Sequence, residues 1–264
     1  MSAPLLPWPV AALAEALAPH LPGCGVEVAA EIDSTNSELM RRARAGRAAP
    51  VLLVAETQTA AHGRLGRSWQ GGAAGSALTC SLGLPLTPRN WSGLSLAVGL
   101  ALAEALHPDI RLKWPNDLWW QGRKLAGILV ETAGAGGAQA ARYTVIGFGL
   151  NLAPLDGAGL STPPAWLQAL LPGIDAPGAL MRVAGPLARA VRAFEHEGFA
   201  PLAGRFNARD ALAGQTVRLS DGVEGAALGV GPDGALHVRT AAGLREVTSA
   251  EISVRPLSAP GGGR

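Results

Sequence analysis

The sequence lacks the features that mark secreted, membrane-spanning or zinc-binding proteins. It has only two cysteines, Cys24 and Cys80, and no Cys-x-x-Cys spacing, so neither a disulfide framework nor a zinc knuckle is supported. We expect both thiols to be free and buried. No run of roughly 18 apolar residues is long enough to cross a membrane, and the first 40 residues contain no Lys or Arg to open a signal peptide. We therefore expect a cytoplasmic protein without a membrane partner.

Charge of either sign is also scarce. Charged residues make up 16% of the 264 residues and the net charge is only +2, so the composition gives no basis for general binding to nucleic acid. Hydrophobic residues make up 48%, which is typical of a soluble globular protein. Any basic site must therefore be local.

Apolar periodicity predicts alternating helices and strands over the first part of the chain. Thr35 and Glu38 have the spacing of a capping box, so we expect a helix to open there and to stop at Gly46. Strands are predicted at 26–32, 51–55, 78–84, 110–114, 118–120, 125–132 and 143–150, and helices at 10–18, 35–45, 94–105 and, in two segments, 163–198.

The last part of the chain has a different pattern. Short strand-like runs occupy 217–219, 226–230, 236–240, 244–248 and 252–254, and Asp-Gly or Ala-Gly turns separate them. Such regular short strands are typical of a small barrel. We therefore predict two domains, residues 1–208 and residues 209–264.

The most informative stretch runs from Glu56 to Trp69. Gly63 and Gly66 allow backbone N–H groups to approach an anion, and the guanidinium groups of Arg64 and Arg67 can hold its oxygens. A solvated basic turn explains the loop equally well. The sequence contains neither Gly-x-x-x-x-Gly-Lys-Ser/Thr nor Gly-x-Gly-x-x-Gly, so any nucleotide must be bound by a different device.

A second stretch surrounds a rigid proline turn. Lys113, Asn116 and Asp117 precede a hairpin that carries Lys124, and this arrangement would place two cations and a magnesium-binding carboxylate around one polyphosphate. These residues can also be explained without a ligand. The lysines can simply be exposed to solvent, as charged residues usually are, and Asp117 can simply accept a hydrogen bond within the turn.

Two further stretches are compatible with either a ligand or ordinary packing. Gly147 and Gly149 remove side chains at alternate positions of a strand that ends at Asn151, which marks a close approach by a flat ligand or a packed neighbour. Ser34, Thr35 and Asn36 fit helix capping, but their polar groups would also suit a small ligand with ureido or amide groups.

Taken together and in this order, these stretches closely resemble the signature motifs of the biotin protein ligases. The matching motifs lie at 33–36, 56–69, 113–117, 124–129 and 147–151, and the similarity covers about residues 30–152 and resumes more weakly at 205–206, 214, 234 and 249–253. Two positions depart from the family pattern, because Ala61 replaces a loop glycine and His62 replaces the first arginine of the loop.

The resemblance implies an α/β (α+β) fold, with a mixed sheet and packed helices like those of class II aminoacyl-tRNA synthetases, followed by an SH3-like barrel. It also implies that ATP activates biotin as biotinyl-5′-adenylate, with Mg²⁺ present, and that a lysine of a biotin carboxyl carrier protein receives the biotinyl group. The relatives are monomers or homodimers. We expect no DNA binding, because about 25 residues before the first predicted strand are too few for the helix-turn-helix domain of the bifunctional relatives.

The resemblance also implies a role for each site residue. Lys124 and Arg64 would be catalytic and hold the biotin carboxylate and the α-phosphate. The remaining substrate-binding residues would be Ser34, Thr35 and Gln58 at the ureido ring, with Asn36, His62 and Gly63 beside them. The nucleotide would be held by Trp69 and Asn151 at adenine and by Arg67, Lys113, Asn116 and Asp117 at the phosphates, with Asp117 also a metal ligand. A lipoate protein ligase and a non-catalytic biotin sensor are the rival functions.

Overall fold

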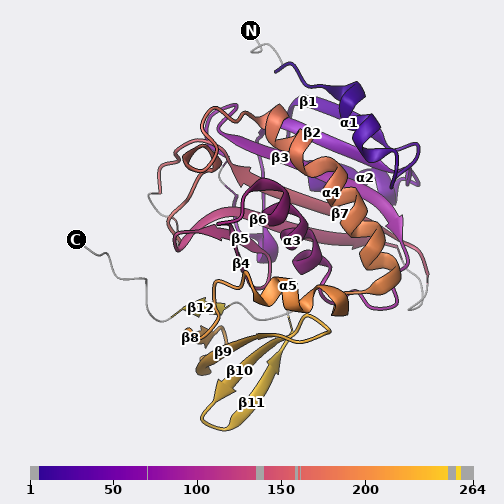
Figure 1. Ribbon diagram of the computed structural model, residues 1–264. Helices are drawn as coiled ribbons and strands as arrows, with labels where there is room; N and C mark the ends of the chain where they lie inside the picture. Colours follow the sequence, from indigo (N-terminus) through magenta and orange to yellow (C-terminus); the bar gives the residue numbers. More distant parts are fainter. Residues whose placement is uncertain are drawn as a thin grey trace.

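The computed structural model describes residues 6–69, 71–134, 140–157, 160, 162–248 and 254–256. Figure 1 shows a large sheet with helices on both faces and, below it, a smaller sheet made by the end of the chain. The larger sheet contains β1 (Gly25–Ile32), β2 (Val51–Gln58), β3 (Ala77–Leu86), β4 (Arg111–Lys113), β5 (Asp117–Trp120), β6 (Arg123–Ala133) and β7 (Arg142–Asn151). The helices are α1 (Val10–Leu17), α2 (Thr35–Arg44), α3 (Leu94–Leu106), α4 (Ala176–Glu197) and α5 (Ala203–Asn207).

The seven strands of the larger sheet have the order β1-β2-β3-β7-β6-β5-β4. Only β1 and β2 pair in parallel, whereas the other neighbours are antiparallel, so the sheet is mixed as expected. Central β3 and β7 are buried almost along their whole length because both of their faces are covered. These two strands therefore form the rigid middle of the domain.

Two hydrophobic cores lie on opposite faces of this sheet. Helices α1, α3 and α4 pack together over one face, and α2 covers the other (Figure 1). Leu39 and Met40 of α2 pack against Leu53 of β2 and against Tyr143 and Val145 of β7. The buried Cys24 and Cys80 are free thiols, as predicted, and burial raises the pKa of Cys24 to about 11. No helix in the described ranges is long and apolar enough to span a bilayer.

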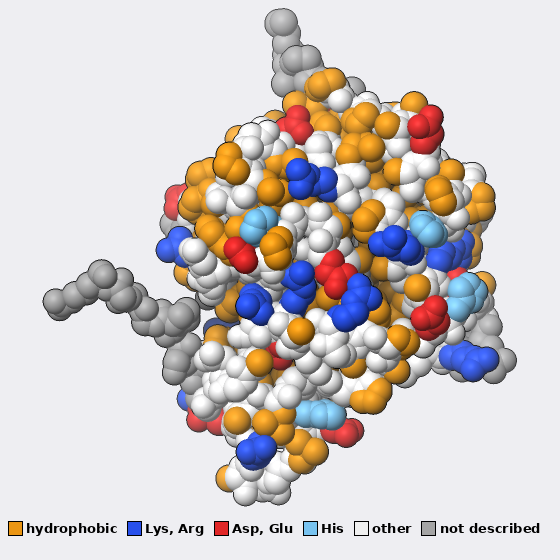
Figure 2. Space-filling view, viewed as in Figure 1, with side chains coloured by type: hydrophobic (Ala, Val, Ile, Leu, Met, Phe, Trp, Pro, Cys, Tyr) orange, Lys and Arg blue, Asp and Glu red, His pale blue; other side chains and the backbone are white. Residues whose placement is uncertain are grey.

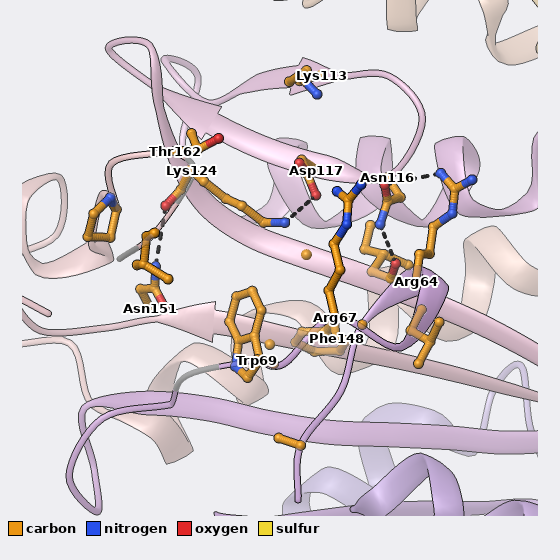
Figure 3. A pocket seen from close by; sticks show the side chains of 18 of the residues that line it. Arg64, Arg67, Trp69, Lys113, Asn116, Asp117, Lys124, Phe148, Asn151 and Thr162 are labelled. Atoms are coloured by element: carbon orange, nitrogen blue, oxygen red, sulfur yellow. Dashed lines mark hydrogen bonds and ion pairs between the residues drawn. The ribbon is translucent and has the colours of Figure 1, made fainter. Parts of the chain in front are cut away.

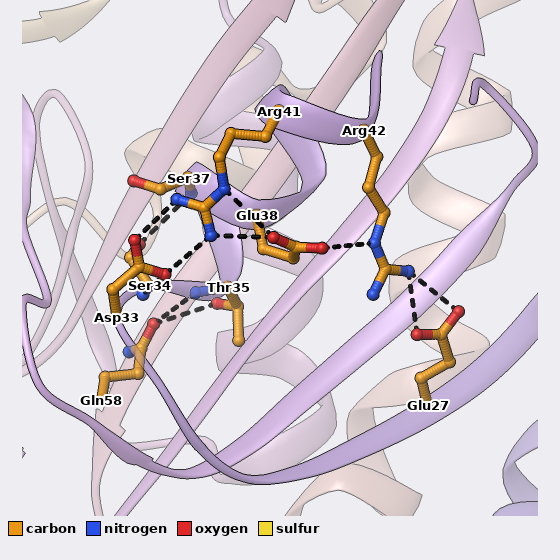
Figure 4. A network of polar contacts seen from close by, with 9 residues as sticks. All are labelled: Glu27, Asp33, Ser34, Thr35, Ser37, Glu38, Arg41, Arg42 and Gln58. Atoms are coloured by element: carbon orange, nitrogen blue, oxygen red, sulfur yellow. Dashed lines mark hydrogen bonds and ion pairs between the residues drawn. The ribbon is translucent and has the colours of Figure 1, made fainter. Parts of the chain in front are cut away.

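The structure corrects two details of the predicted helices. Residues 163–198 contain one long helix, α4, preceded by a 3₁₀ turn at Leu167–Ala169 rather than by a second helix. Pro172 and Gly173 lie between the two and prevent a continuous helix. The capping residue of α2 is Ser34 rather than Thr35, since Ser34 Oγ accepts a hydrogen bond from the Ser37 amide at 3.3 Å. Glu38 instead pairs with Arg41 and Arg42 on the helix surface (Figure 4).

The smaller sheet contains β8 (Thr216–Leu219), β9 (Glu224–Val230), β10 (Leu236–Thr240), β11 (Gly243–Val247) and β12 (Val254–Pro256), in the order β11-β10-β9-β8-β12. All neighbours are antiparallel, so the short strands predicted for the tail are confirmed where they are described. Residues 249–253, which carry part of the family resemblance and the start of the last predicted strand, lie outside the described residues. The proposed domain boundary at residue 209 falls between α5 and β8.

The two sheets are joined through β4 and the segment that follows α5. Backbone hydrogen bonds of 2.8 Å connect the Leu112 amide to the Arg209 carbonyl and the Ala211 amide to the Leu112 carbonyl. Buried Trp114 donates its indole N–H to the Gly234 carbonyl at 3.1 Å. Figure 2 shows basic, acidic and hydrophobic side chains interspersed on the face that spans this junction. The turn after β4 is therefore held against the smaller sheet by specific contacts.

A carboxyl group is buried at this junction. Asp210 is only 8% exposed, and one of its oxygens accepts a hydrogen bond from the Leu212 amide at 2.8 Å. Its other oxygen has no hydrogen-bond partner within the described structure. Burial raises the pKa of the Asp210 carboxyl from 3.8 to about 6, although the Leu212 amide and Lys113 act in the opposite direction. Ionisation of Asp210 is thus unfavourable in the folded protein.

We predict that Asp210→Asn removes a pH-dependent loss of stability. Because the pKa of Asp210 is raised in the folded state, its favourable contribution is complete below the unfolded value and is lost as the pH rises through about 6. Urea unfolding should show similar stability for wild type and variant near pH ~4, and a variant more stable by up to about 3 kcal/mol near pH ~8. An unchanged difference between the two pH values would contradict this account.

Candidate active site

A cavity of about 630 Å³ lies against strands β6 and β7 of the larger sheet, a volume suited to a small organic ligand. It is enclosed by the start of α2, the loop 61–69, the β4–β5 turn, strands β6 and β7, residues 155, 160 and 162–164, and β12 of the smaller sheet. The structure brings every site residue predicted from the sequence into its wall: Ser34, Thr35, Asn36, Gln58, His62, Gly63, Arg64, Arg67, Trp69, Lys113, Asn116, Asp117, Lys124 and Asn151.

The loop 61–69, here called the anion loop, is folded back on itself by backbone hydrogen bonds. The Gly63 amide donates to the Arg67 carbonyl at 2.7 Å, and the Trp69 amide donates to the Ala61 carbonyl at 3.0 Å. Leu65 and Gly66 adopt left-handed backbone conformations at the tip, with φ of 59° and 68°, and glycine meets that requirement at the second position. The tight turn places two arginines, at 64 and 67, in one wall of the cavity.

The wall of the cavity carries far more positive than negative charge. Its described acidic side chain is Asp117, whereas its described cationic side chains are Arg64, Arg67, Lys113, Arg123, Lys124 and Arg255. Burial lowers the pKa values of both Arg64 and Lys113, although Asp117 opposes this effect. Because desolvated like charges repel each other, the arrangement favours an anionic ligand.

Lys124 contacts both an acidic and an aromatic side chain of the cavity wall. Its Nζ lies 2.7 Å from Oδ1 of Asp117 and 5.7 Å from the centre of the Trp69 ring. Figure 3 shows the side chain extending from β6 across the cavity toward Asp117. Lys113 lies over the Trp119 ring at 5.3 Å. Both lysines predicted to face the ligand therefore point into the cavity rather than into solvent.

Asn116 and Asn151 are held by the protein itself. Asn116 donates to the Ile128 carbonyl at 2.8 Å and its Oδ1 accepts a 3.4 Å hydrogen bond from Arg64. The amide nitrogen of Asn151 donates to the carbonyls of Lys124 and Ala165 at 3.3 and 3.0 Å. The side-chain nitrogen of Asn151 is therefore already used, and only its side-chain oxygen can accept a hydrogen bond from a ligand.

The paired glycines of β7 mark two close approaches, as the sequence predicted. A Cβ atom at Gly149 would lie 2.4 Å from the Trp69 ring, and one at Gly147 would lie 2.0 Å from Oδ1 of Asn36. Gly127 on the neighbouring strand β6 lies under the same tryptophan, with a Cβ-to-ring distance of 3.2 Å. A packed side chain, rather than a ligand, occupies the space above each glycine of β7.

Uncharged amide and hydroxyl side chains, joined by hydrogen bonds, line the end of the cavity near α2. Oε1 of Gln58 accepts from the Thr35 amide at 2.6 Å and from the Thr35 hydroxyl at 3.2 Å. The Thr35 hydroxyl lies 2.7 Å from the buried Ser81 hydroxyl, which donates to Oδ1 of Asn36 at 2.6 Å. Asn36 in turn donates to Glu131 at 2.8 Å. This end therefore presents oriented amide and hydroxyl groups to the cavity.

Sequence reasoning missed several residues of this site, among them Ser81, Glu131 and Arg255. Ser81 and Glu131 belong to the hydrogen-bond network but come from β3 and β6, and Arg255 of β12 reaches the cavity from the smaller sheet. Ser81 was detectable as a polar residue inside an apolar strand. Nothing in the local sequence around Glu131 or Arg255 signals its place in the site.

Comparison with known proteins is consistent with this arrangement. Residues 28–151 match the "Biotin/lipoate A/B protein ligase family" and residues 213–255 match the "Biotin protein ligase C terminal domain". The bifunctional ligase/repressor BirA of Escherichia coli is 35% identical, over 95% of this chain and 80% of that protein. The biotin–[acetyl-CoA-carboxylase] ligase of Paracoccus denitrificans is 34% identical, over 84% of this chain and 98% of that one.

Solved structures agree with the sequence relatives. The biotin protein ligase from Aquifex aeolicus in complex with biotin and ATP superimposes with a TM-score of 0.73 at 26% identity, covering 88% of this chain and 98% of that chain. The match of the C-terminal segment to a domain named for biotin protein ligases favours biotin over lipoate. On the combined evidence of the motifs, the cavity they line and these similarities, the chain belongs to the biotin protein ligase family.

Proposed function

We propose that this chain activates biotin with ATP and transfers it to a lysine of a biotin carboxyl carrier domain, such as that of acetyl-CoA carboxylase. The observation that carries the proposal is a single cavity with two chemically different ends, a neutral amide and hydroxyl network and a cluster of cations. Biotin has a neutral ureido ring at one end and a carboxylate at the other. The cavity would therefore bind it in one direction, with the carboxylate beside the phosphates of ATP.

At the neutral end, Ser34, Thr35 and Gln58 would bind the ureido ring. Thr35 already orients Gln58, so the polar groups of the network are preorganised before a ligand arrives. Buried N–H and C=O groups of the ring would otherwise lose hydrogen bonds to water. Asn36, His62 and Gly63 would surround the same part of the ligand.

At the cationic end, Lys124 and Arg64 would carry the chemistry. A carboxylate oxygen of biotin attacks the α-phosphorus of ATP, the bond to pyrophosphate breaks, and biotinyl-5′-adenylate forms. Lys124 would lie between the two approaching anions and reduce their repulsion, and Arg64 would hold the oxygens of the product. In the second step the neutral amine of the carrier lysine attacks the acyl carbon, AMP leaves, and the nitrogen loses a proton.

The nucleotide would be held by the remaining wall. Trp69 offers a ring face that is supported from behind by Gly149 and Gly127, which suits adenine, and the oxygen of Asn151 would face the edge of the base. Arg67, Lys113 and Asn116 would bind the phosphates. The neighbouring Arg255 would contribute from the smaller sheet.

Magnesium would enter the site together with ATP. No group of three potential metal-binding side chains occurs in the described part of the chain, so a metal cage made by protein alone is not supported there. Mg²⁺ characteristically binds one or two carboxylates together with substrate phosphates, and Asp117 can supply one such carboxylate. Since Asp117 also pairs with Lys124, its carboxylate would be shared between the two cations. When bound, the ion would supply charge neutralisation at the phosphates.

The proposal also covers DNA binding, cellular location and oligomeric state. The net charge of +2 gives no electrostatic reason for the chain to bind an operator DNA. We propose a cytoplasmic enzyme that acts as a monomer or homodimer on a protein substrate.

We predict that Lys124→Ala and Arg64→Gly affect different half-reactions. Losing Lys124 should slow adenylate formation by about 100-fold or more, the usual scale for one preorganised electrostatic contact, while biotin binding weakens less. Arg64→Gly should still form adenylate but release it faster, because the contact that holds the product is gone.

Single-turnover mixing followed by size filtration separates bound from released adenylate for wild type and both variants. Pyrophosphate release from ATP that requires biotin would establish the first half-reaction in the wild type. Wild-type adenylate formation by Lys124→Ala, or wild-type retention by Arg64→Gly, would show that the assigned roles are wrong.

We further predict that Gly149→Ala weakens ATP binding selectively. The added Cβ would occupy the space of the Trp69 ring, so the ring must move away from its present position. The KM for ATP should rise about tenfold, at the lower end of what base stacking contributes, with biotin affinity changed much less. Gly204→Ala is a matched control, because no atom lies within 4 Å of a Cβ placed there. Equal losses of ATP and biotin affinity would contradict the prediction.

A further inference from the structure

The anion loop is connected to the neutral end of the cavity through Glu131 of β6. Oε2 of Glu131 accepts a hydrogen bond from Nδ2 of Asn36 at 2.8 Å, and Nε2 of His62 lies 3.9 Å from the same oxygen. The side chains of His62 and Glu131 are 30% and 34% exposed, so water reaches both. One carboxylate thus lies between a residue of the cavity wall and a residue of the anion loop.

Asn36 gives this carboxylate a fixed position. Its Oδ1 accepts from the buried Ser81 hydroxyl at 2.6 Å, and it occupies the space above Gly147 that any larger residue would fill. Asn36 is itself only 4% exposed. Because Glu131 is held on this side by a buried partner, its contact with His62 acts on the position of the loop.

The anion loop makes most of its backbone hydrogen bonds within itself, as described above. The side-chain contacts that tie it to the sheet include the bond of Arg64 to Asn116 and the approach of His62 to Glu131. His62 is two residues before Arg64, so a change in the position of His62 moves the backbone that carries the arginine.

The charges around His62 have both signs. Glu131 attracts a protonated imidazole, whereas the arginines of the loop and the cations across the cavity oppose it. On α2, Asp33 and Glu38 are paired with Arg41 and Arg42 (Figure 4), so Glu131 is the carboxylate that His62 meets. The charged side chains that line the cavity, from the loop itself and from the other walls, are Arg64, Arg67, Lys113, Asp117, Arg123, Lys124 and Arg255.

We propose that His62 and Glu131 form a pH-dependent ion pair that positions the anion loop, so that the enzyme retains biotinyl-adenylate more firmly at low pH than at high pH. An imidazole ordinarily changes charge between about pH 5 and pH 8, whereas an arginine at position 62 would stay charged over that pH range. Loss of the proton leaves a neutral ring 3.9 Å from a carboxylate, and the electrostatic attraction disappears. Both residues act on the intermediate through Arg64, so they are positioning residues, and the inference rests on the proposed function.

The test measures escape of biotinyl-adenylate from the full-length enzyme after single-turnover mixing with biotin and ATP, at about pH 6 and about pH 8.5. Wild type should release adenylate about two- to fivefold faster at the higher pH, the range expected for a half-exposed ion pair. Glu131→Gln keeps an oxygen for Asn36 but removes the charge, and it should release adenylate at the fast rate at both pH values. His62→Arg restores a permanent charge and should release it slowly at both.

A matched control uses a second imidazole and carboxylate pair. Nε2 of His237 lies 3.6 Å from Glu246 on the smaller sheet, and Glu246→Gln should retain the wild-type pH dependence. If wild type forms adenylate but Glu131→Gln and His62→Arg keep its full pH dependence, the ion pair has no such role and the proposed function is unaffected. If wild type forms no adenylate at either pH, both the proposed function and this inference are wrong.

Discussion

The arrangement of the whole site depends on two glycines of β7, Gly147 and Gly149, because they have no side chains. β7 is the most enclosed strand beside β3, and Gly147 and Gly149 leave space above it for packed side chains. Asn36 fills the space above the first glycine and Trp69 fills the space above the second. In the proposed function, these two residues would lie at opposite ends of the bound intermediate, Asn36 at the ureido ring and Trp69 at adenine. A single strand thus sets the distance between the two halves of the site.

Electrostatic repulsion is the second constraint. Six cationic side chains and one carboxylate line the described wall, and burial already lowers the pKa values of Arg64 and Lys113. The protein tolerates this crowding by pairing Lys124 with Asp117 and by placing aromatic faces beneath both lysines. A polyanionic ligand would relieve the remaining repulsion. Binding of such a ligand and ordering of the wall are therefore expected to favour each other.

Local sequence predicted the parts of the molecule that depend on local physics. Alternating apolar residues located the strands, and the Gly-Arg loop, the Lys113 to Asp117 turn and the β7 glycines all reached the same cavity. The capping residue of α2 was predicted one position too late because Ser34 and Thr35 are adjacent and both residue types cap helices. Glu131 and Arg255 were missed because their roles depend on contacts between distant segments. The family resemblance supplied the roles of the residues, which spacing alone left open.

The two lysines of the cavity have a consequence for the fate of the intermediate. They are the only lysines in the sequence, at 113 and 124. The acceptor for the biotinyl group is itself a lysine amine, yet one of these two is paired with Asp117 and the other lies against Trp119. The surface therefore carries no lysine that could react with adenylate escaping into solution. Released adenylate would label lysines of neighbouring proteins before those of the enzyme that made it. Biotinylation of the enzyme itself is therefore a poor measure of how much adenylate it releases.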